Sequence, residues 1–257
     1  MKILNRLNTS FKDKQEITLD LDNSRFHAIV GQNCSGKTYV LKTIALEFSG
    51  SYHRLSFAGL SKNVETNPWS VAQERIQDDG GYLCNVLDHL YENAPNNFKL
   101  LQEFLARIIP NTVNISLHRF DNHTQIELKT KNIASIKQAS ISNGCLLTIG
   151  ILTILLNPQQ PNLILIDDID QGLHSTAQRE LIEVIKEIVE SKPELQIIVS
   201  THSPYVVDEL TQSQVHVLRS LETGEITCKR LDCHPDSEWA KQTLTTGEFW
   251  DSVGEDW

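Results

Sequence analysis

The stretch "GQNCSGKT", residues 31–38, constrains the fold most, because its glycines call for a tight loop between two regular elements. The preceding segment "RFHAIV" is an apolar run typical of a buried strand. The following segment "YVLKTIALEFSG" has apolar residues at helical spacing and stops at Gly50. A strand, this pattern and a helix in succession favour a phosphate-binding loop over a joint that merely contains glycine.

The loop and the first helical turn supply the predicted nucleotide-binding residues. Glycine lets the backbone curl so that successive N–H groups point into one hollow, where the helix N-terminus favours anions. The lysine of such a loop reaches the β- and γ-phosphates, and the hydroxyl of the next residue is a ligand for Mg²⁺. The predicted nucleotide-binding residues are Gly31, Asn33, Cys34, Ser35, Gly36, Lys37 and Thr38.

An acidic cluster follows the apolar strand in "NLILIDDID". Asp167 closes this strand at the carboxyl edge of the predicted sheet, where ligands bind in open α/β folds, so we assign it with Thr38 to the Mg²⁺ site. Asp168 is the candidate to orient or deprotonate the attacking water. Helix capping explains the pair poorly because the next helix begins near Ser175, whereas Asp170 is open to a structural role.

A third polar segment ends the apolar strand "IIVS", which continues into Thr201, His202 and Ser203. A histidine at such a strand tip can donate a hydrogen bond to the γ-phosphate or to the water. A histidine of this kind can also be an ordinary surface residue. Its position after the aspartate pair favours the catalytic interpretation of His202.

Strands alternate with helices along the chain, and two strands are continuous apolar runs. This pattern indicates an α/β fold with a mostly parallel sheet covered on both faces, that is, a P-loop NTPase fold. We expect one domain over residues 1–257, with residues 60–135 forming an inserted helical and β lid. The length of 257 residues allows one large domain with a sizeable core.

Composition limits the partners and the compartment. The formal net charge of −10 argues against a general nucleic-acid binder, although Lys129, Lys131 and Lys137 form either a local DNA contact or a solvated charged face. The longest apolar stretch, "CLLTIGILTILL", is too short to cross a bilayer, so no membrane association is expected. The five cysteines show no C-x-x-C spacing and are expected to be free thiols in the cytoplasm.

With these motifs in place, the chain resembles ATPases of the ATP-binding-cassette type, in the SMC/RecF-like group of predicted AAA ATPases. The resemblance rests on "GQNCSGKT", "LILIDDIDQGLHS" and "IIVSTHSP", with softer matches in residues 78–110 and in the last 13 residues, "TTGEFWDSVGEDW". It implies ATP and Mg²⁺ as ligands, and a homodimer or higher oligomer that sandwiches two ATP molecules.

The resemblance also implies a signature sequence that completes the partner's site, and here "ISNGCLLTIGILTILL" is the aligned stretch. Ser142 and Gly144 match the serine and glycine that meet the partner's γ-phosphate, although Ser142 could equally be a helix N-cap. Leu147 stands where such proteins commonly have a basic residue. Asp168 stands where the group usually has glutamate, and its shorter side chain predicts slow hydrolysis.

Three functions remain open at this stage. The first is an ATP-hydrolysing switch that controls a separate effector, in prokaryotic defence or DNA processing by family analogy. The second is a scaffold that binds ATP with little turnover. The third is the ATPase subunit of a transporter, which the T-H-S-P and G-L-H segments fit less well.

Overall fold

A computed structural model describes residues 6–11, 15–21, 24–48, 51–56, 75–120, 123–132, 135–221, 223, 225–255 and 257. The strands are β1 (Arg6–Phe11), β2 (Gln15–Asp20), β3 (Phe26–Val30), β4 (Tyr52–Ser56), β5 (Thr112–Phe120), β6 (His123–Thr130), β7 (Ile136–Lys137), β8 (Leu163–Asp167), β9 (Gln196–Ser200), β10 (Val215–Ser220) and β11 (Ile226–Arg230). The helices are α1 (Lys37–Glu47), α3 (Leu83–Asn93), α4 (Pro95–Ile108), α5 (Asn143–Leu156), α6 (Ser175–Ser191), α7 (Pro204–Asp208), α8 (Ser237–Thr243) and α9 (Thr246–Val253), with 3₁₀ turns η1 (Gln138–Ser140), η2 (Gln212–Gln214) and η3 (Leu231–Cys233).

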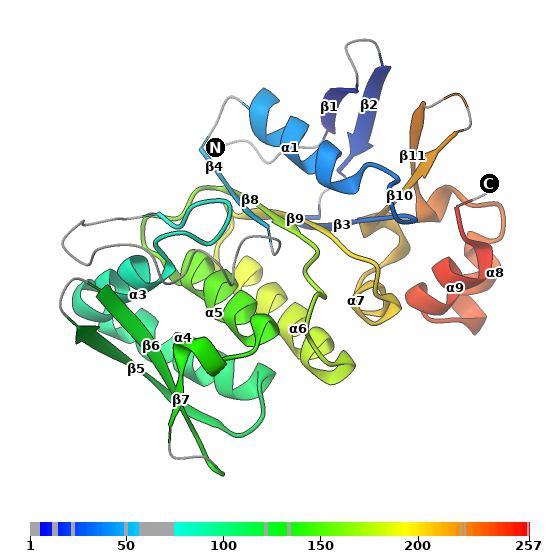
Figure 1. Cartoon of the computed structure of the whole chain (residues 1–257). Coiled ribbons are helices and arrows are strands. Elements are labelled where there is room, and N and C mark those ends of the chain that lie inside the picture. The colour runs from blue at the N-terminus through cyan, green and yellow to red at the C-terminus, as the bar shows by residue number, and fades with distance from the viewer. Residues whose placement is uncertain are drawn as a thin grey trace. The chain divides into compact units, whose positions relative to one another are not determined.

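A six-stranded sheet in the order β11-β10-β3-β9-β8-β4 organises the fold (Figure 1). The pairs β10–β3, β3–β9 and β9–β8 are parallel, and β11 adds an antiparallel edge to β10. Every residue of β3, β8 and β9 is buried, as expected for strands of a parallel sheet that is covered on both faces. The predicted α/β fold with a mostly parallel sheet is therefore confirmed.

The chain divides into two compact units. The first unit comprises Met1–Arg54, Pro161–Asp170 and Ile185–Trp257, and the second comprises Leu55–Gln160 and Gln171–Val184. The predicted lid lies within the sequence range of the second unit. The description of residues 1–257 as one domain with an inserted lid stays a prediction.

The first unit contains the sheet and the phosphate loop. Its core includes Leu19 of β2, Leu41 of α1, Leu165 of β8 and Ile198 of β9, all of them essentially inaccessible to solvent. Helix α1 packs on β1, β8 and β9 (Figure 1). The loop of residues 31–36 connects the end of β3 to Lys37, the first residue of this helix. Helix α7 packs against α9 farther along the chain.

The second unit combines helices with a small antiparallel sheet. Strand β6 pairs with both β5 and β7. Helices α3 and α4 have a polar and an apolar face and are separated by one residue, Ala94, whereas α5 is buried almost throughout. The predicted turn at "ENAPNN" is thus shorter than expected, because Pro95 begins α4 at a position where its missing N–H costs nothing.

Some details differ from the sequence-based expectation or lie beyond the described residues. Strands β1 and β7 and helices α8 and α9 were not predicted. The sequence gives no position for a Mg²⁺-sensing glutamine, because Gln73 lies too far along the chain, and Gln73 is outside the described residues. A hairpin turn is expected at Thr223-Gly224, and Gly224 is also outside the described residues. All five cysteines are free thiols, as predicted.

Candidate phosphate-binding site

The loop after β3 has the backbone conformation that its glycines suggest. Gly31 and Gly36 have φ values of 149° and 97°, in the region that disfavours side chains. A Cβ atom at Gly31 would lie 2.3 Å from the Leu218 carbonyl oxygen of β10, so the loop passes directly against that strand. Cys34 also has positive φ and is exposed. Glycine at position 31 is therefore required by backbone conformation and by space.

Helix α1 begins without the usual protein cap. Gly36 occupies the N-cap position, no side chain accepts a hydrogen bond there, and no acidic residue lies in the first turn. The first N–H groups of a helix have no partner within the helix and carry a partial positive charge. The start of α1 is therefore suited to an anion, with the exposed Thr38 hydroxyl in the same turn.

Lys37 lies inside the loop. Its ammonium group donates hydrogen bonds to the carbonyl oxygens of Gly31, at 2.7 Å, and Gln32, at 2.9 Å. Burial lowers the pKa of Lys37, while the negative charges of Asp168 and Asp167 act in the opposite direction. The lysine is thus a buried cation within electrostatic range of both aspartates.

Ser200, the last residue of β9, connects Asp167, the last residue of β8, with Asp168. Its hydroxyl donates to Asp167 Oδ1 at 2.5 Å and accepts from the Asp168 backbone N–H at 2.8 Å. Asp167 is 2% exposed, and Asp168 has a left-handed φ of 54°. The sequence-based analysis did not identify Ser200, although a serine that ends a fully apolar strand was a usable signal.

Asp170 holds the histidine segment in place. Its Oδ1 accepts hydrogen bonds from the Thr201 hydroxyl at 2.5 Å and from the His202 backbone N–H at 3.2 Å. The Thr201 N–H in turn donates to the Ile29 carbonyl of β3 at 3.2 Å. The structural role left open for Asp170 is therefore observed, and the ends of β3, β8 and β9 are joined by hydrogen bonds.

The electrostatics single out Asp168 within this cluster. Burial and the neighbouring charges of Asp167 and Asp170 raise the pKa of Asp168, whereas His202 and Lys37 lower it. A carboxyl group whose ionised form is disfavoured in this way is a common feature of catalytic sites. The structure thus brings together Lys37, Asp167, Asp168 and His202. Of these four residues, His202 is exposed.

The residues present also suit a magnesium ion. The candidate ligands, the Thr38 hydroxyl and the Asp167 carboxylate, are hard oxygen donors of the kind that Mg²⁺ prefers. Among the described residues, no group of three or more histidine, cysteine, aspartate or glutamate side chains is arranged to hold a metal. The donor set therefore fits an ion that takes most of its ligands from phosphates and water.

Ser142 and Gly144, the predicted signature residues, belong to the second unit. The Ser142 hydroxyl accepts a hydrogen bond from the Cys145 N–H at 3.4 Å and so caps α5, which is the alternative considered from the sequence. A Cβ atom at Gly144 would lie 2.1 Å from the Gly172 carbonyl oxygen. Both residues thus have a structural role in their own chain, and their predicted contact with a partner subunit stays a prediction.

Comparison with known protein families gives a match over about half of the chain. Residues 81–208 match the sequence model of the family described as "AAA domain, putative AbiEii toxin, Type IV TA system". The match includes the strand ending at Asp167 and the Thr201–Ser203 segment, and it begins after the phosphate loop.

Curated relatives are similar to parts or to most of the chain. The "Retron Vc95 probable ATPase" of Vibrio cholerae is 25% identical over 48% of this chain and 26% of its own length. The Septu protein PtuA of Bacillus thuringiensis is 33% identical over 35% of this chain and 22% of its own length. A "Probable ATP-dependent transporter ycf16" of Cyanidium caldarium is 24% identical over 91% of this chain and 92% of its own length. The chain thus matches about a quarter of the retron and Septu relatives.

A solved structure shows the same fold. The SMC head bound to the C-terminal winged-helix domain of ScpA superimposes with a TM-score of 0.55 at 15% identity, covering 88% of this chain and 96% of that one. The resemblance to SMC-type ATPase heads is therefore confirmed at the level of the fold. Within the part of the chain that the structure describes, no helix is long and apolar enough to cross a membrane.

Proposed function

We propose that this chain is a magnesium-dependent ATP switch, because residues 81–208 match an AAA-domain family and the fold is that of an SMC-type ATPase head. In this proposal the protein binds ATP, dimerises around it, hydrolyses it slowly and thereby controls a separate effector. The observation that carries the proposal is the set of hydrogen bonds that joins the ends of β3, β8 and β9, because these strand ends lead into the phosphate loop, the two aspartates and the histidine segment.

Each residue has a definite role in the proposed reaction. The loop N–H groups and the uncapped start of α1 bind the phosphates, and Lys37 exchanges its loop carbonyl partners for phosphate oxygens. Magnesium, when bound, neutralises phosphate charge and is held by Thr38 and Asp167. Asp168 orients the attacking water and accepts its proton, and His202 donates a hydrogen bond to the γ-phosphate or to that water.

Slow turnover follows from the identity of residue 168. Aspartate is one methylene shorter than the glutamate usual in the resembling group, which is about 1.5 Å of reach. Misplacement on this scale costs about a hundredfold in rate. We therefore expect Asp168→Asn to accumulate an ATP-bound dimer, visible by size-exclusion chromatography, and Asp168→Glu to hydrolyse ATP faster than the wild type. Wild-type turnover in Asp168→Asn would remove Asp168 from the mechanism.

The proposed dimer uses Ser142 and Gly144 of each subunit on the partner's γ-phosphate, by analogy with related ATPases. Capping of α5 by Ser142 supports this role indirectly, because it fixes the serine at the N-terminus of a buried helix. An anion from a partner would meet that helix end favourably.

The effector and the biological setting are proposed from the relatives. The family description names a toxin–antitoxin system, and the partial matches are a retron ATPase and a Septu protein. These similarities support a role in prokaryotic defence, with the effector supplied by another polypeptide or by another region of a longer chain, in the cytoplasm where ATP and magnesium are available. Proteins that co-purify with Asp168→Asn in the presence of ATP would identify it.

Two alternatives have specific support. Aspartate at position 168 and leucine at position 147 favour a scaffold that binds ATP without turnover. The similarity to a probable ATP-dependent transporter over most of the chain favours a transporter subunit. DNA binding through the exposed Lys129, Lys131 and Lys137 is a further possibility, which a salt-titrated duplex-binding assay tests.

The decisive experiment compares two lysine variants of the same helix. Lys37→Ala should lower Mg²⁺-dependent ATP hydrolysis by at least about a hundredfold, since it removes a charged donor to the phosphates. Lys42→Ala, which removes an exposed lysine one turn farther along α1, should leave the rate unchanged. A clear wild-type rate supports the switch, ATP binding without turnover supports the scaffold, and no binding of ATP by calorimetry refutes both.

A further inference from the structure

A cavity of about 280 Å³ lies beside the phosphate loop, within the first unit. Gln32, Asn33 and Ser35 of the loop line one side, and Arg219 and Ser220 at the end of β10 line another. Glu255, which follows α9 near the end of the sequence, also lines it. The proposed phosphate-binding roles leave the glutamate and the β10 residues without a function.

Ser35 provides a specific sign that this cavity receives a polar ligand. The residue is 3% exposed, and its hydroxyl oxygen has no hydrogen-bond partner in the structure. A buried hydroxyl without a partner costs free energy, so such groups are rare unless a ligand completes them. Ser35 lines the cavity, and its oxygen lies close enough to Gly31 that a Cβ there would approach it to 2.9 Å.

Glu255 is held near the loop by its neighbours. Helix α9 ends at Gly254, which has a φ of 59° and so redirects the chain. Two residues after Glu255, the Trp257 indole donates to the Gly254 carbonyl at 3.1 Å, and Lys229 of β11 donates to the Trp257 carbonyl at 2.9 Å. Burial lowers the pKa of Lys37, and the negative charge of Glu255 acts in the opposite direction after those of Asp168 and Asp167.

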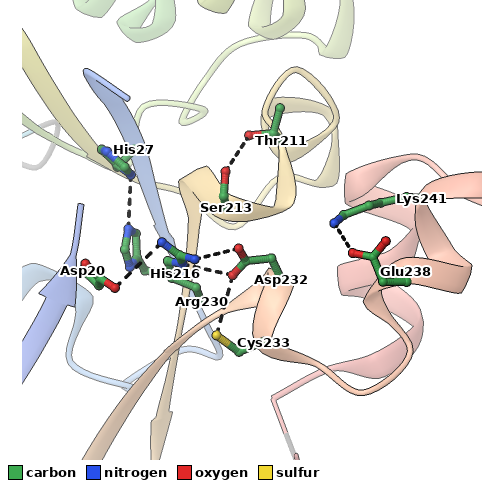
Figure 2. Close-up of polar contacts among 10 residues, drawn as sticks. All are labelled: Asp20, His27, Thr211, Ser213, His216, Arg230, Asp232, Cys233, Glu238 and Lys241. Atoms are coloured by element: carbon green, nitrogen blue, oxygen red, sulfur yellow. Dashed lines mark hydrogen bonds and ion pairs between the residues drawn. The ribbon is translucent and has the colours of Figure 1, made fainter. Parts of the chain in front are cut away.

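Trp257 and strand β11 make further contacts with neighbouring residues. The Trp257 ring contacts His234, which follows η3, with 4.9 Å between ring centroids. The guanidinium of Arg230, the last residue of β11, makes two hydrogen bonds to Asp232 of η3 and an ion pair with Asp20 of β2 (Figure 2). Arg230 therefore links β11 to η3 and to β2.

We propose that this cavity is the subsite for the ribose of the bound nucleotide, and that Glu255 accepts hydrogen bonds from the ribose hydroxyls. The proposal rests on the proposed ATP-binding function and names how the nucleoside part is recognised. A carboxylate at this place repels phosphates but accepts well from hydroxyl groups. The Ser35, Ser220, Gln32 and Asn33 side chains of the lining are neutral and polar, and Arg219 adds a positive charge. A cavity of this size suits one part of a nucleotide rather than a whole drug-sized ligand.

Calorimetry with four ligands tests the proposal on the full chain in the presence of Mg²⁺. The ligands are ATP, 2′-deoxy-ATP, 3′-deoxy-ATP and inorganic triphosphate, which reports the phosphate loop alone. Wild type should bind ATP about tenfold to a hundredfold more tightly than at least one of the deoxy nucleotides, the range for a hydrogen bond to a charged group. Glu255→Ala should lose this discrimination without weakening the binding of triphosphate, and Glu255→Gln should lose less of it.

Two control variants complete the design. Asp251→Asn removes an exposed acidic charge from α9 without touching the cavity and should preserve the preference for ATP. Trp257→Ala loosens the support of Glu255 and should reduce the preference partly, while circular dichroism shows the fold intact.

The outcomes separate this inference from the proposed function. Failure of both ATP and triphosphate to bind wild type would refute the ATP switch and the ribose subsite with it. If both ligands bind, the ribose subsite is overturned by any of three results for Glu255→Ala. The first is unchanged discrimination among the nucleotides, and the second is equally weaker binding of ATP and triphosphate. The third is equally tighter binding of both, which would mean that Glu255 only repels phosphates from the loop.

Discussion

The two units of this protein differ in the exposure and pairing of their charged side chains. In the second unit, Arg119 pairs with Asp88 and Glu92, and Arg107 pairs with Glu180, on partly or fully exposed surface. Arg119 donates hydrogen bonds to Glu92 and Asp88, and these bonds raise the pKa of Arg119. In the first unit, Asp167 is 2% exposed, and three aspartates crowd one end of the sheet near a single buried lysine.

The contrast supports the proposal that the first unit carries the chemistry. Exposed ion pairs contribute little to stability and mainly keep a surface polar. A buried acidic cluster costs stability and persists only where another requirement maintains it, which is the usual mark of a functional site. Substitutions in the buried acidic cluster should therefore change activity and stability more than substitutions in the exposed ion pairs.

The largest effect is expected from Asp168→Asn. Removing a general base should lower the ATPase rate by about a hundredfold to ten-thousandfold. Because the pKa of Asp168 is raised, wild-type turnover should fall on acidification at a pH above the usual aspartate range near about 4. A rate profile that is flat down to that range would contradict the role of Asp168.

The same substitution should stabilise the fold, which sharpens the contrast between the units. A carboxyl with a raised folded-state pKa opposes folding at neutral pH, and this cost disappears as pH falls below its unfolded-state value. The melting temperature of Asp168→Asn should therefore exceed that of wild type by a few degrees at pH 7, and the two should converge near about pH 4. Asp88→Asn in the second unit should show no such gain.

Glycine substitutions should rank by backbone strain and space. Gly31→Ala combines a forbidden φ with a contact to Leu218 O and should cost about 3 kcal/mol in denaturant unfolding. Gly144→Ala has ordinary helical φ but meets the Gly172 carbonyl and should cost about 2 kcal/mol. Gly254→Ala has positive φ in open space and should cost about 1 kcal/mol. The reverse order would show that local relaxation, rather than these contacts, governs the cost.

Ser142 variants test whether the second unit has more than a structural role. Ser142→Ala removes the cap of α5 and should cost about 1 kcal/mol of stability. Ser142→Asp keeps a good cap and the melting temperature, but places a negative charge where the partner's γ-phosphate is proposed to bind. Its ATPase rate should fall strongly. An unchanged rate in this variant would leave Ser142 as a helix cap only.

The smallest effect is expected from Arg119→Ala. Its partners are partly exposed, so its loss should cost about 0.5 kcal/mol and leave ATP hydrolysis unchanged. Denaturant midpoints and steady-state rates provide the measurement. A loss above about 2 kcal/mol would mean that charge in the second unit is not dispensable.

The sequence alone predicted the phosphate loop, most of the element order and the parallel sheet. Local patterns sufficed, because glycine spacing, strand alternation and helical periodicity act over a few residues. The loop at Gly31–Thr38, the strand ending at Asp167 and the strand ending before Thr201 were all located in this way.

Other features depended on segments far apart in the sequence. Nothing near Ser200 indicates that its hydroxyl bridges Asp167 and Asp168, and nothing near Gly144 indicates the approach of Gly172. Capping of α5 by Ser142 was one of two alternatives that the sequence left open.

Local sequence patterns predicted a phosphate-binding loop, an acidic strand end and a histidine segment in this chain. Only the tertiary structure decided that Glu255 lies near Lys37 beside a cavity with the unpartnered Ser35 hydroxyl. The physical reason is that local conformation is set by neighbouring residues, whereas burial and electrostatic contact depend on which distant segments the packed core brings together.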